Sequence, residues 1–171
     1  VSPSYRSARD RLSSYLPRAV SKGSPVTSST QLSDCHVATH ALLSVKPKYA
    51  DSILAGVKRY EFRRVIFARP VAVVLVYATV PRARVVGEFD VEGVVMDSPQ
   101  QLWSLTRDNA GIDECAFFEY FEGAKKGYAI QIGQVRHYPT PFCPVEVLNM
   151  RPPQSFAYVV DARSVPSARA I

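Results

Sequence analysis

The sequence predicts an α+β fold that is mainly β, a small mixed β-barrel of about five to six strands with two to three short helices. The first observation behind this prediction is that strand-like segments recur along the chain with only short helical segments between them. The second is composition: 47% of the residues are hydrophobic and 21% are charged, as in a globular chain. With 171 residues, the chain has room for one ordinary domain with tails.

The two ends of the chain differ from its middle. Residues 1–33 hold ten serines and no sustained hydrophobic period, so too little apolar surface is available to offset the entropy of ordering. We therefore expect a disordered Ser/Arg-rich tail over residues 1–38 and an ordered domain over residues 39–160. Residues 161–171 are rich in Ser, Ala and Arg, and we expect a flexible tail there.

The ordered part begins with a strand and a helix. Ala41 to Val45 is a short apolar run typical of a buried strand. Pro47 favours the first position of a helix, because it has no N–H to lose and its φ is preset. Ala50, Ile53 and Leu54 form one helical face, and Gly56 favours the left-handed turn that ends many helices.

Four strands and two helices are expected next. Residues 57–64 alternate, with Tyr60 and Phe62 on one face and charged residues on the other. Residues 71–77 form a near-continuous β-branched run, and residues 85–95 alternate again. Ser98-Pro99 favours a helix start, a second helix is expected over residues 113–121, and residues 127–135 alternate as a strand. Residues 136–160 are interrupted by prolines.

Charge is unevenly distributed along the chain, whose formal net charge is +6 and whose pI is about 9.4. Residues 41–84 hold nine basic and two acidic residues, a net +7, whereas residues 85–150 hold four basic and ten acidic residues, a net −6. A basic block within the folded part indicates a polyanionic partner such as RNA. A surface of simply mixed sign is the alternative.

Several classes of protein are disfavoured. The longest apolar run, residues 71–78, is far shorter than the ~20 residues that a membrane span needs, and the N-terminus has no signal-peptide core. The three cysteines are widely spaced without a CxxC pair, so we expect a cytoplasmic protein. Phosphate-loop, dinucleotide and GxSxG motifs are absent, and no cofactor is predicted. Cys35-His36-x3-His40 has spacing suited to a metal but lacks a fourth ligand nearby, so no metal site is predicted.

The segment from Leu43 to Arg64, LSVKPKYADSILAGVKRYEFRR, is the most informative part of the chain. It resembles the signature of the ASCH (activating signal cointegrator homology) family, and the later pieces at residues 77–79, 86–89, 127–130 and 152–156 fit as well. The resemblance covers roughly residues 40–160 and implies a PUA-like barrel. It also implies RNA binding with a regulatory role in transcription or translation, although a few small members are amidohydrolases on modified nucleosides or ribonucleases.

The residues themselves support a binding cleft. Lys46 lies at a predicted helix N-terminus, where N–H groups favour anions, and Lys58 and Arg63 follow closely enough to converge there. Glu61 would orient an arginine or accept hydrogen bonds from a base, and tyrosines would stack on one. The expected partner is RNA or a nucleoside- or nucleotide-like ligand, and the residues expected to bind it are Lys46, Tyr49, Lys58, Glu61, Arg63, Arg64, Tyr77, Thr79, Tyr128, Ser155 and Phe156.

Other functions stay open. A hydrolase would use a hydroxyl of Thr79, Ser44 or Ser155 with Lys46 or Lys58 as base and Glu61 as partner. The amidohydrolase members have a threonine three residues after the Gly-x-Lys lysine, and Glu61 stands there in this chain, so we favour a binding module over an enzyme. Alternatively, Glu61 forms only a surface ion pair. A third alternative is a protein-interaction adaptor that uses the acidic residues Glu88, Asp90 and Glu92. The oligomeric state is not predicted.

Overall fold

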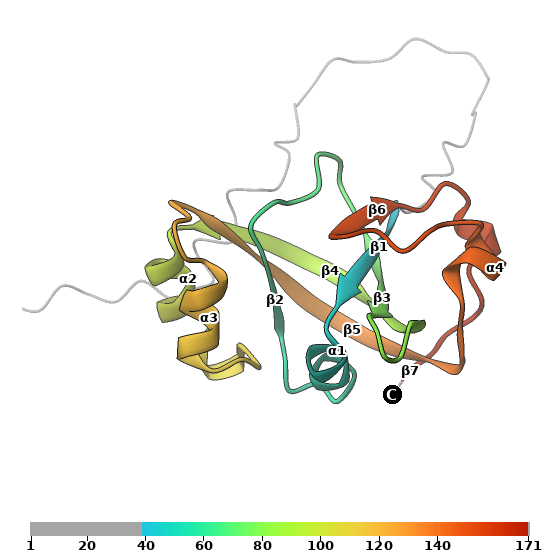
Figure 1. The fold of residues 1–171 in the computed structure, drawn as a ribbon, viewed down its shortest axis with the longest axis horizontal. Helices are drawn as coiled ribbons and strands as arrows, with labels where there is room; N and C mark the ends of the chain where they lie inside the picture. Colours follow the sequence, from blue (N-terminus) through green and yellow to red (C-terminus); the bar gives the residue numbers. More distant parts are fainter. Residues whose placement is uncertain (1–38, 171) are drawn as a thin grey trace, which may run out of the picture. The chain divides into compact units, whose positions relative to one another are not determined.

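The computed structural model describes residues 39–170, so the tail predicted for residues 1–38 lies outside the described residues. The described chain forms one seven-stranded sheet in the order β2-β5-β4-β3-β1-β6, with β7 paired to β5 (Figure 1). The elements are β1 (His40–Val45), α1 (Pro47–Leu54), β2 (Tyr60–Arg63), β3 (Val73–Ala78), β4 (Arg84–Asp97), α2 (Pro99–Thr106), α3 (Glu114–Tyr120), β5 (Gly127–Phe142), α4 (Pro144–Leu148), β6 (Phe156–Tyr158) and β7 (Arg169–Ala170), with 3-10 helices at Arg107–Asn109 and Ala162–Ser164.

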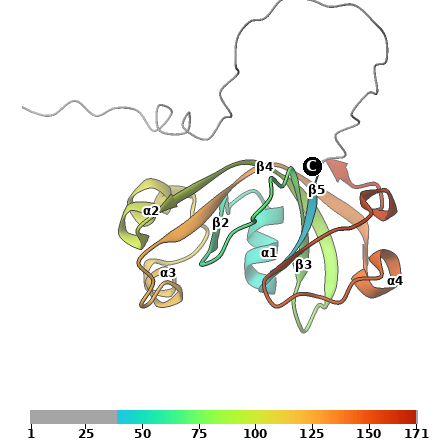
Figure 2. The same ribbon diagram turned by 90° about the horizontal axis from the view of Figure 1, so that it is seen from above.

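The predicted fold class, α+β and mainly β, is confirmed. The sheet curls into a half-barrel, and Figure 2 shows α1 inside its curve. The strands outnumber the expected five to six because β6 and β7 are only three and two residues long. None of the helices in residues 39–170 is long and apolar enough to cross a membrane.

The first two strands of the domain lie near opposite ends of the sheet. β1 pairs with β3 in parallel, and the connection between them carries α1 and β2. β2 pairs antiparallel with β5, at the far edge of the sheet from β1. Because the sheet is curled, these distant strands approach each other across its opening, where a guanidinium N–H of Arg63 donates to the Ser44 carbonyl at 2.6 Å. Side chains therefore bridge the seam between the two ends of the sheet.

The start of the domain follows the sequence closely. Pro47 occupies the first turn of α1, and Ala50, Ile53 and Leu54 are its buried residues, as predicted. Gly56 has φ +72°, in the region that favours glycine, and its N–H donates to Ile53 O. The buried face of α1 packs on the inner side of the sheet, in the largest hydrophobic cluster of the described residues.

Helices α2 and α3 cover the other end of β4 and β5. The Ser98 and Asp113 side chains accept hydrogen bonds from backbone N–H groups in the first turns of α2 and α3, as expected of N-caps. The two helices enclose an aromatic cluster in which Phe117 is fully buried against Phe62 and Trp103. This cluster fixes α3 relative to β2.

The last part of the domain differs most from expectation. β5 continues to Phe142, seven residues beyond the predicted strand end, and pairs with β4 along most of its length. Where the sequence indicated a flexible tail from residue 161, the structure has the 3-10 helix at Ala162–Ser164 and the strand β7 on β5. Backbone pairing thus extends the domain beyond residue 160.

Candidate functional site

A pocket of about 640 Å³ is lined by residues of α1, β2 and α3. Its volume is that of an ordinary small-ligand site. The seam of the half-barrel forms one side of it. The lining residues are Ser44, Val45, Lys46, Lys48, Tyr49, Lys58, Glu61, Phe62, Arg63, Thr79, Ile112, Ala116, Glu119, Tyr120 and Gln154.

Lys58 lies at the floor of this pocket and is only 2% exposed. Its ammonium group donates to the Ala110 carbonyl at 2.9 Å and lies 3.7 Å from Glu61 Oε2. Gly111 has φ +61°, and a Cβ there would come within 2.4 Å of Lys58 Cβ, so only glycine lets this loop close over the lysine. Burial lowers the pKa of Lys58 below its ordinary 10.5, and the Glu61 carboxylate opposes part of that shift.

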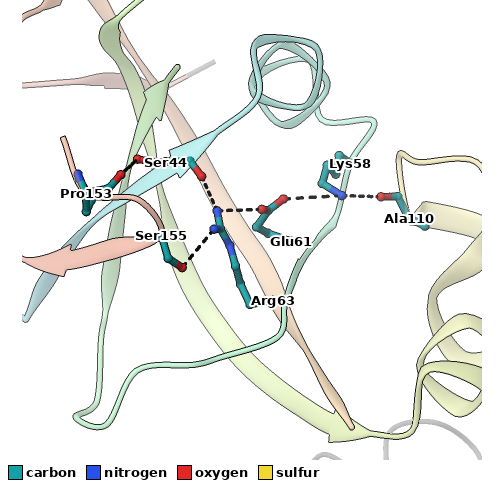
Figure 3. Close-up of polar contacts among 7 residues, drawn as sticks. All are labelled: Ser44, Lys58, Glu61, Arg63, Ala110, Pro153 and Ser155. Carbon is teal, nitrogen blue, oxygen red and sulfur yellow. Dashed lines mark hydrogen bonds and ion pairs between the residues drawn. The ribbon is translucent and has the colours of Figure 1, made fainter. Parts of the chain in front are cut away.

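Glu61 and Arg63 complete the floor (Figure 3). Arg63 Nη2 lies 3.1 Å from Glu61 Oε1 while it donates to the Ser44 carbonyl, and Nη1 donates weakly to Ser155 Oγ at 3.5 Å. Arg63 Nε is buried without a hydrogen-bond partner. We call Lys58, Glu61 and Arg63 the pocket cluster. It holds two buried cations against one carboxylate and so carries a net positive charge.

The mouth of the pocket is also basic. Lys46 and Lys48 are exposed at the N-terminal end of α1, where Lys46 is the N-cap residue, as the sequence predicted. The Lys48 ammonium lies 4.6 Å from the centroid of the Tyr49 ring, and Lys58 approaches the same ring at 5.2 Å. Exposed lysines at a mouth and buried cations at a floor make a site that attracts anions.

The structure brings together six of the expected binding residues in the pocket lining: Lys46, Tyr49, Lys58, Glu61, Arg63 and Thr79. Ser155 lies behind them, against Arg63. Four others are elsewhere: Arg64 is exposed beyond the end of β2, Tyr77 is buried in a separate core cluster, Tyr128 is on β5, and Phe156 packs on Phe67 and Tyr158. Tyr77 and Phe156 serve the core because their strands are covered on the faces they occupy.

Helix α3 supplies residues that the sequence reasoning missed. Ala116, Glu119 and Tyr120 line the pocket, at the i, i+3 and i+4 spacing of one helical face. That spacing was the available signal, but Phe117 and Phe121 on the neighbouring face dominate the pattern. Desolvation raises the pKa of Tyr120, and the charge of nearby Arg63 opposes it. Gln154 joins the lining from the loop before β6.

The other pockets and polar groups of residues 39–170 offer fewer side chains that could bind a ligand. Two smaller pockets, of about 310 and 440 Å³, share Gly56 and exposed Arg59 as lining residues. Within residues 39–170, no group of three or more His, Cys, Asp or Glu side chains is placed to hold a metal ion. Cys35 and His36 of the Cys-His-His spacing lie outside the described residues.

The chain is similar to a protein of Zymomonas mobilis named as an ASCH domain-containing ribonuclease. The two are 31% identical over 125 residues, which are 70% of this chain and 83% of that protein. This chain belongs to the ASCH-domain family. A crystal structure of ASCH from the same organism matches this ASCH domain with a TM-score of 0.66 and 30% identity, over 73% of this chain and 90% of that one. The predicted family resemblance is therefore confirmed.

Two proteins of Ureaplasma parvum are also similar to this chain in sequence. Ureaplasma parvum ATP synthase subunit alpha and large ribosomal subunit protein uL22 are each 29% identical over 119 residues, but the ASCH domain spans only 15% and 38% of their lengths. No family model matches the chain.

Proposed function

We propose that this ASCH domain binds RNA, with a segment of a single strand held in the pocket between α1 and α3. The observation that carries the proposal is the pocket cluster, in which Lys58 and Arg63 share one carboxylate at the floor of a cavity. A net positive floor below a mouth with two exposed lysines favours a polyanion. The wider role that we propose is regulation of transcription or translation through such binding.

Two further observations support RNA over other anions. The similar Zymomonas mobilis protein carries ribonuclease in its name. The pocket is lined by hydroxyls, an amide and aromatic rings in addition to charges, namely Ser44, Thr79, Gln154, Tyr49 and Tyr120. Mixed lining of this kind suits a nucleotide better than a simple inorganic anion.

The test is fluorescence anisotropy with a short single-stranded RNA over a series of salt concentrations. The variant Lys46→Ala, Lys48→Ala removes the mouth cations without disturbing buried residues, and we expect weaker binding and a salt slope shallower by about 1 to 2 units, at ~0.7 per lost phosphate contact. Lys125→Ala, Lys126→Ala is the matched control, because this exposed pair lies outside the pocket lining. Equal losses in both variants would mean that binding does not use the pocket.

RNA cleavage is a second candidate function, and the state of Lys58 favours it. A lysine whose pKa is lowered by burial is a better general base at neutral pH than an ordinary one. We propose that the uncharged form of Lys58 would take the proton of a ribose 2′-hydroxyl. Attack of that oxygen on the adjacent phosphorus would break the P–O5′ bond and leave a 2′,3′-cyclic phosphate, with Arg63 stabilising the added negative charge. The departing 5′-oxygen would take the proton back from the Lys58 ammonium and become a free hydroxyl.

The binding experiment distinguishes the two functions when the RNA is recovered and weighed by mass spectrometry. Cyclic-phosphate fragments that form with the wild type but not with Lys58→Met would support cleavage. Intact RNA with retained binding would leave the domain as a non-catalytic binder.

A further inference from the structure

Tyr120 is an unusually exposed aromatic residue for its position. Its exposed fraction is 40%, whereas the two phenylalanines of α3 are buried (Phe117) or half-buried (Phe118). The residue lines the pocket from α3, and Tyr49 lines it from α1. The two helices lie on either side of β2 (Figure 1). Each helix therefore contributes one tyrosine to the pocket lining.

The packing of α3 holds the Tyr120 ring in place. The ring contacts Phe121 edge-to-face, with centroids 4.9 Å apart, and Phe121 is 2% exposed. Phe117, one turn earlier, is fully buried and contacts Phe62 of β2 at 4.8 Å. An aromatic ring that is anchored at one edge and open to a cavity loses little conformational entropy when a ligand covers it.

The other residues around Tyr120 suit a flat ligand with polar edges. Ile112 and Ala116 extend the apolar wall next to Tyr120, whereas the charged pocket cluster lies at the floor. A nucleobase has two apolar faces and a polar rim, so it matches apolar walls above a charged floor. A site for phosphate alone would need cations and N–H donors but no aromatic wall.

We propose that Tyr120, together with Tyr49, forms a stacking slot for one unpaired nucleobase, so that the pocket recognises the base and not only the phosphates of its ligand. This inference rests on the proposed RNA binding and assigns to Tyr120 a role in substrate selection. It predicts that double-stranded RNA, whose bases are already stacked and paired, is a poor ligand.

The experiment compares two ligands of equal charge: a short single-stranded RNA and a ribose-phosphate oligomer of the same length without bases. Tyr120→Leu should weaken RNA binding by about 5- to 150-fold, which is the range for loss of one base-stacking contact. Binding of the base-free oligomer should not change. Tyr120→Phe keeps the ring and should bind RNA within about twofold of the wild type. Phe118→Leu is the control for loss of an aromatic residue on the same helix outside the pocket lining.

The outcomes separate the slot from RNA binding in general. Wild-type protein that binds RNA and the base-free oligomer equally well would overturn the slot and leave RNA binding intact. Failure to bind either ligand would overturn both. If Tyr120→Leu does not fold, 2-aminopurine placed in the RNA decides: quenching of its fluorescence by the wild type supports stacking, and unchanged fluorescence on binding overturns it.

Discussion

Two ionic clusters in this domain use the same kinds of residue in opposite ways. The pocket cluster sets Lys58 and Arg63 around one carboxylate, Glu61. The second, which we call the sheet cluster, sets Glu88 and Asp90 of β4 around Arg136 of β5. The pocket cluster has one more cation than anions, and the sheet cluster has one more anion than cations.

The two clusters differ in how completely their groups are paired. In the sheet cluster, Arg136 Nε meets Glu88 at 2.7 Å, and both terminal nitrogens reach Asp90, at 2.5 and 3.0 Å. The hydroxyl of Tyr138 also donates to Glu88. Burial and this bond raise the pKa of Tyr138, and the bonds to Asp90 and then Glu88 raise the pKa of Arg136. The pocket cluster is looser, with one pair at 3.7 Å and Arg63 Nε unpaired.

We propose that the difference separates a structural use of charge in the sheet cluster from a ligand-binding use in the pocket cluster. A fully paired cluster between two strands adds to the sheet, whereas an incompletely paired cluster at a cavity keeps bonding capacity for a ligand. The pairing in the sheet cluster also affects the alternative prediction that the acidic residues of β4 bind a protein partner. Because Arg136 pairs with Glu88 and Asp90, less of their charge is left for another molecule.

The largest expected effect tests the pocket cluster by removing its only carboxylate. Glu61→Gln keeps the shape but leaves Lys58 and Arg63 as buried cations without a counter-charge. We expect the free energy of unfolding in urea to fall by about 3–5 kcal/mol. Glu119→Gln is the control, since Glu119 lines the same pocket but is exposed, and it should change stability by less than about 0.5 kcal/mol. Similar small values for both would show that Glu61 does not hold the cluster together.

The next effect tests the sheet cluster. Arg136→Met leaves Glu88, with 12% of its side chain exposed, and Asp90, with 41%, without their cation. We expect a loss of about 2 kcal/mol in unfolding free energy, less than for Glu61 because water reaches Asp90. RNA affinity measured by anisotropy should stay at the wild-type value. A loss of affinity in a folded protein would contradict the division between the two clusters.

The smallest effect concerns the pH dependence of stability. The folded pKa of Lys58 lies below the unfolded value of 10.5, so between these two values the unfolded chain binds more protons. Stability should therefore rise with pH through this window, by at most ~1.4 kcal/mol per pH unit for one proton. Lys58→Met should lack this rise and unfold at neutral pH no more easily than the wild type, since Arg63 still pairs with Glu61. If the urea midpoints of the two proteins change with pH in the same way from pH 7 to 10, the prediction is contradicted.

The sequence predicted the fold and six of the residues that line the candidate pocket, for identifiable reasons. α1 and its ending at Gly56 follow from local signals, and so does the alternation that puts Phe62 on one side of β2 and the charges on the other. Alternation could not show that Lys58 is buried, because residues 110 and 111 cover it from a distant loop. Nor could it show that Tyr120 joins the pocket, since that depends on how α3 packs against β2.

The seam of the half-barrel has a consequence for how the site comes into being during synthesis. Arg63 is held by Ser44 from the start of the domain and by Ser155 from near its end. Ser44 is itself held from the C-terminal side, since its hydroxyl donates to the Pro153 carbonyl. A nascent chain that has not yet released residues 153–155 from the ribosome lacks these C-terminal contacts of the seam, and it lacks Gln154 of the pocket lining. The complete pocket therefore forms only when almost the whole domain has emerged, so that a truncated product would lack the complete site.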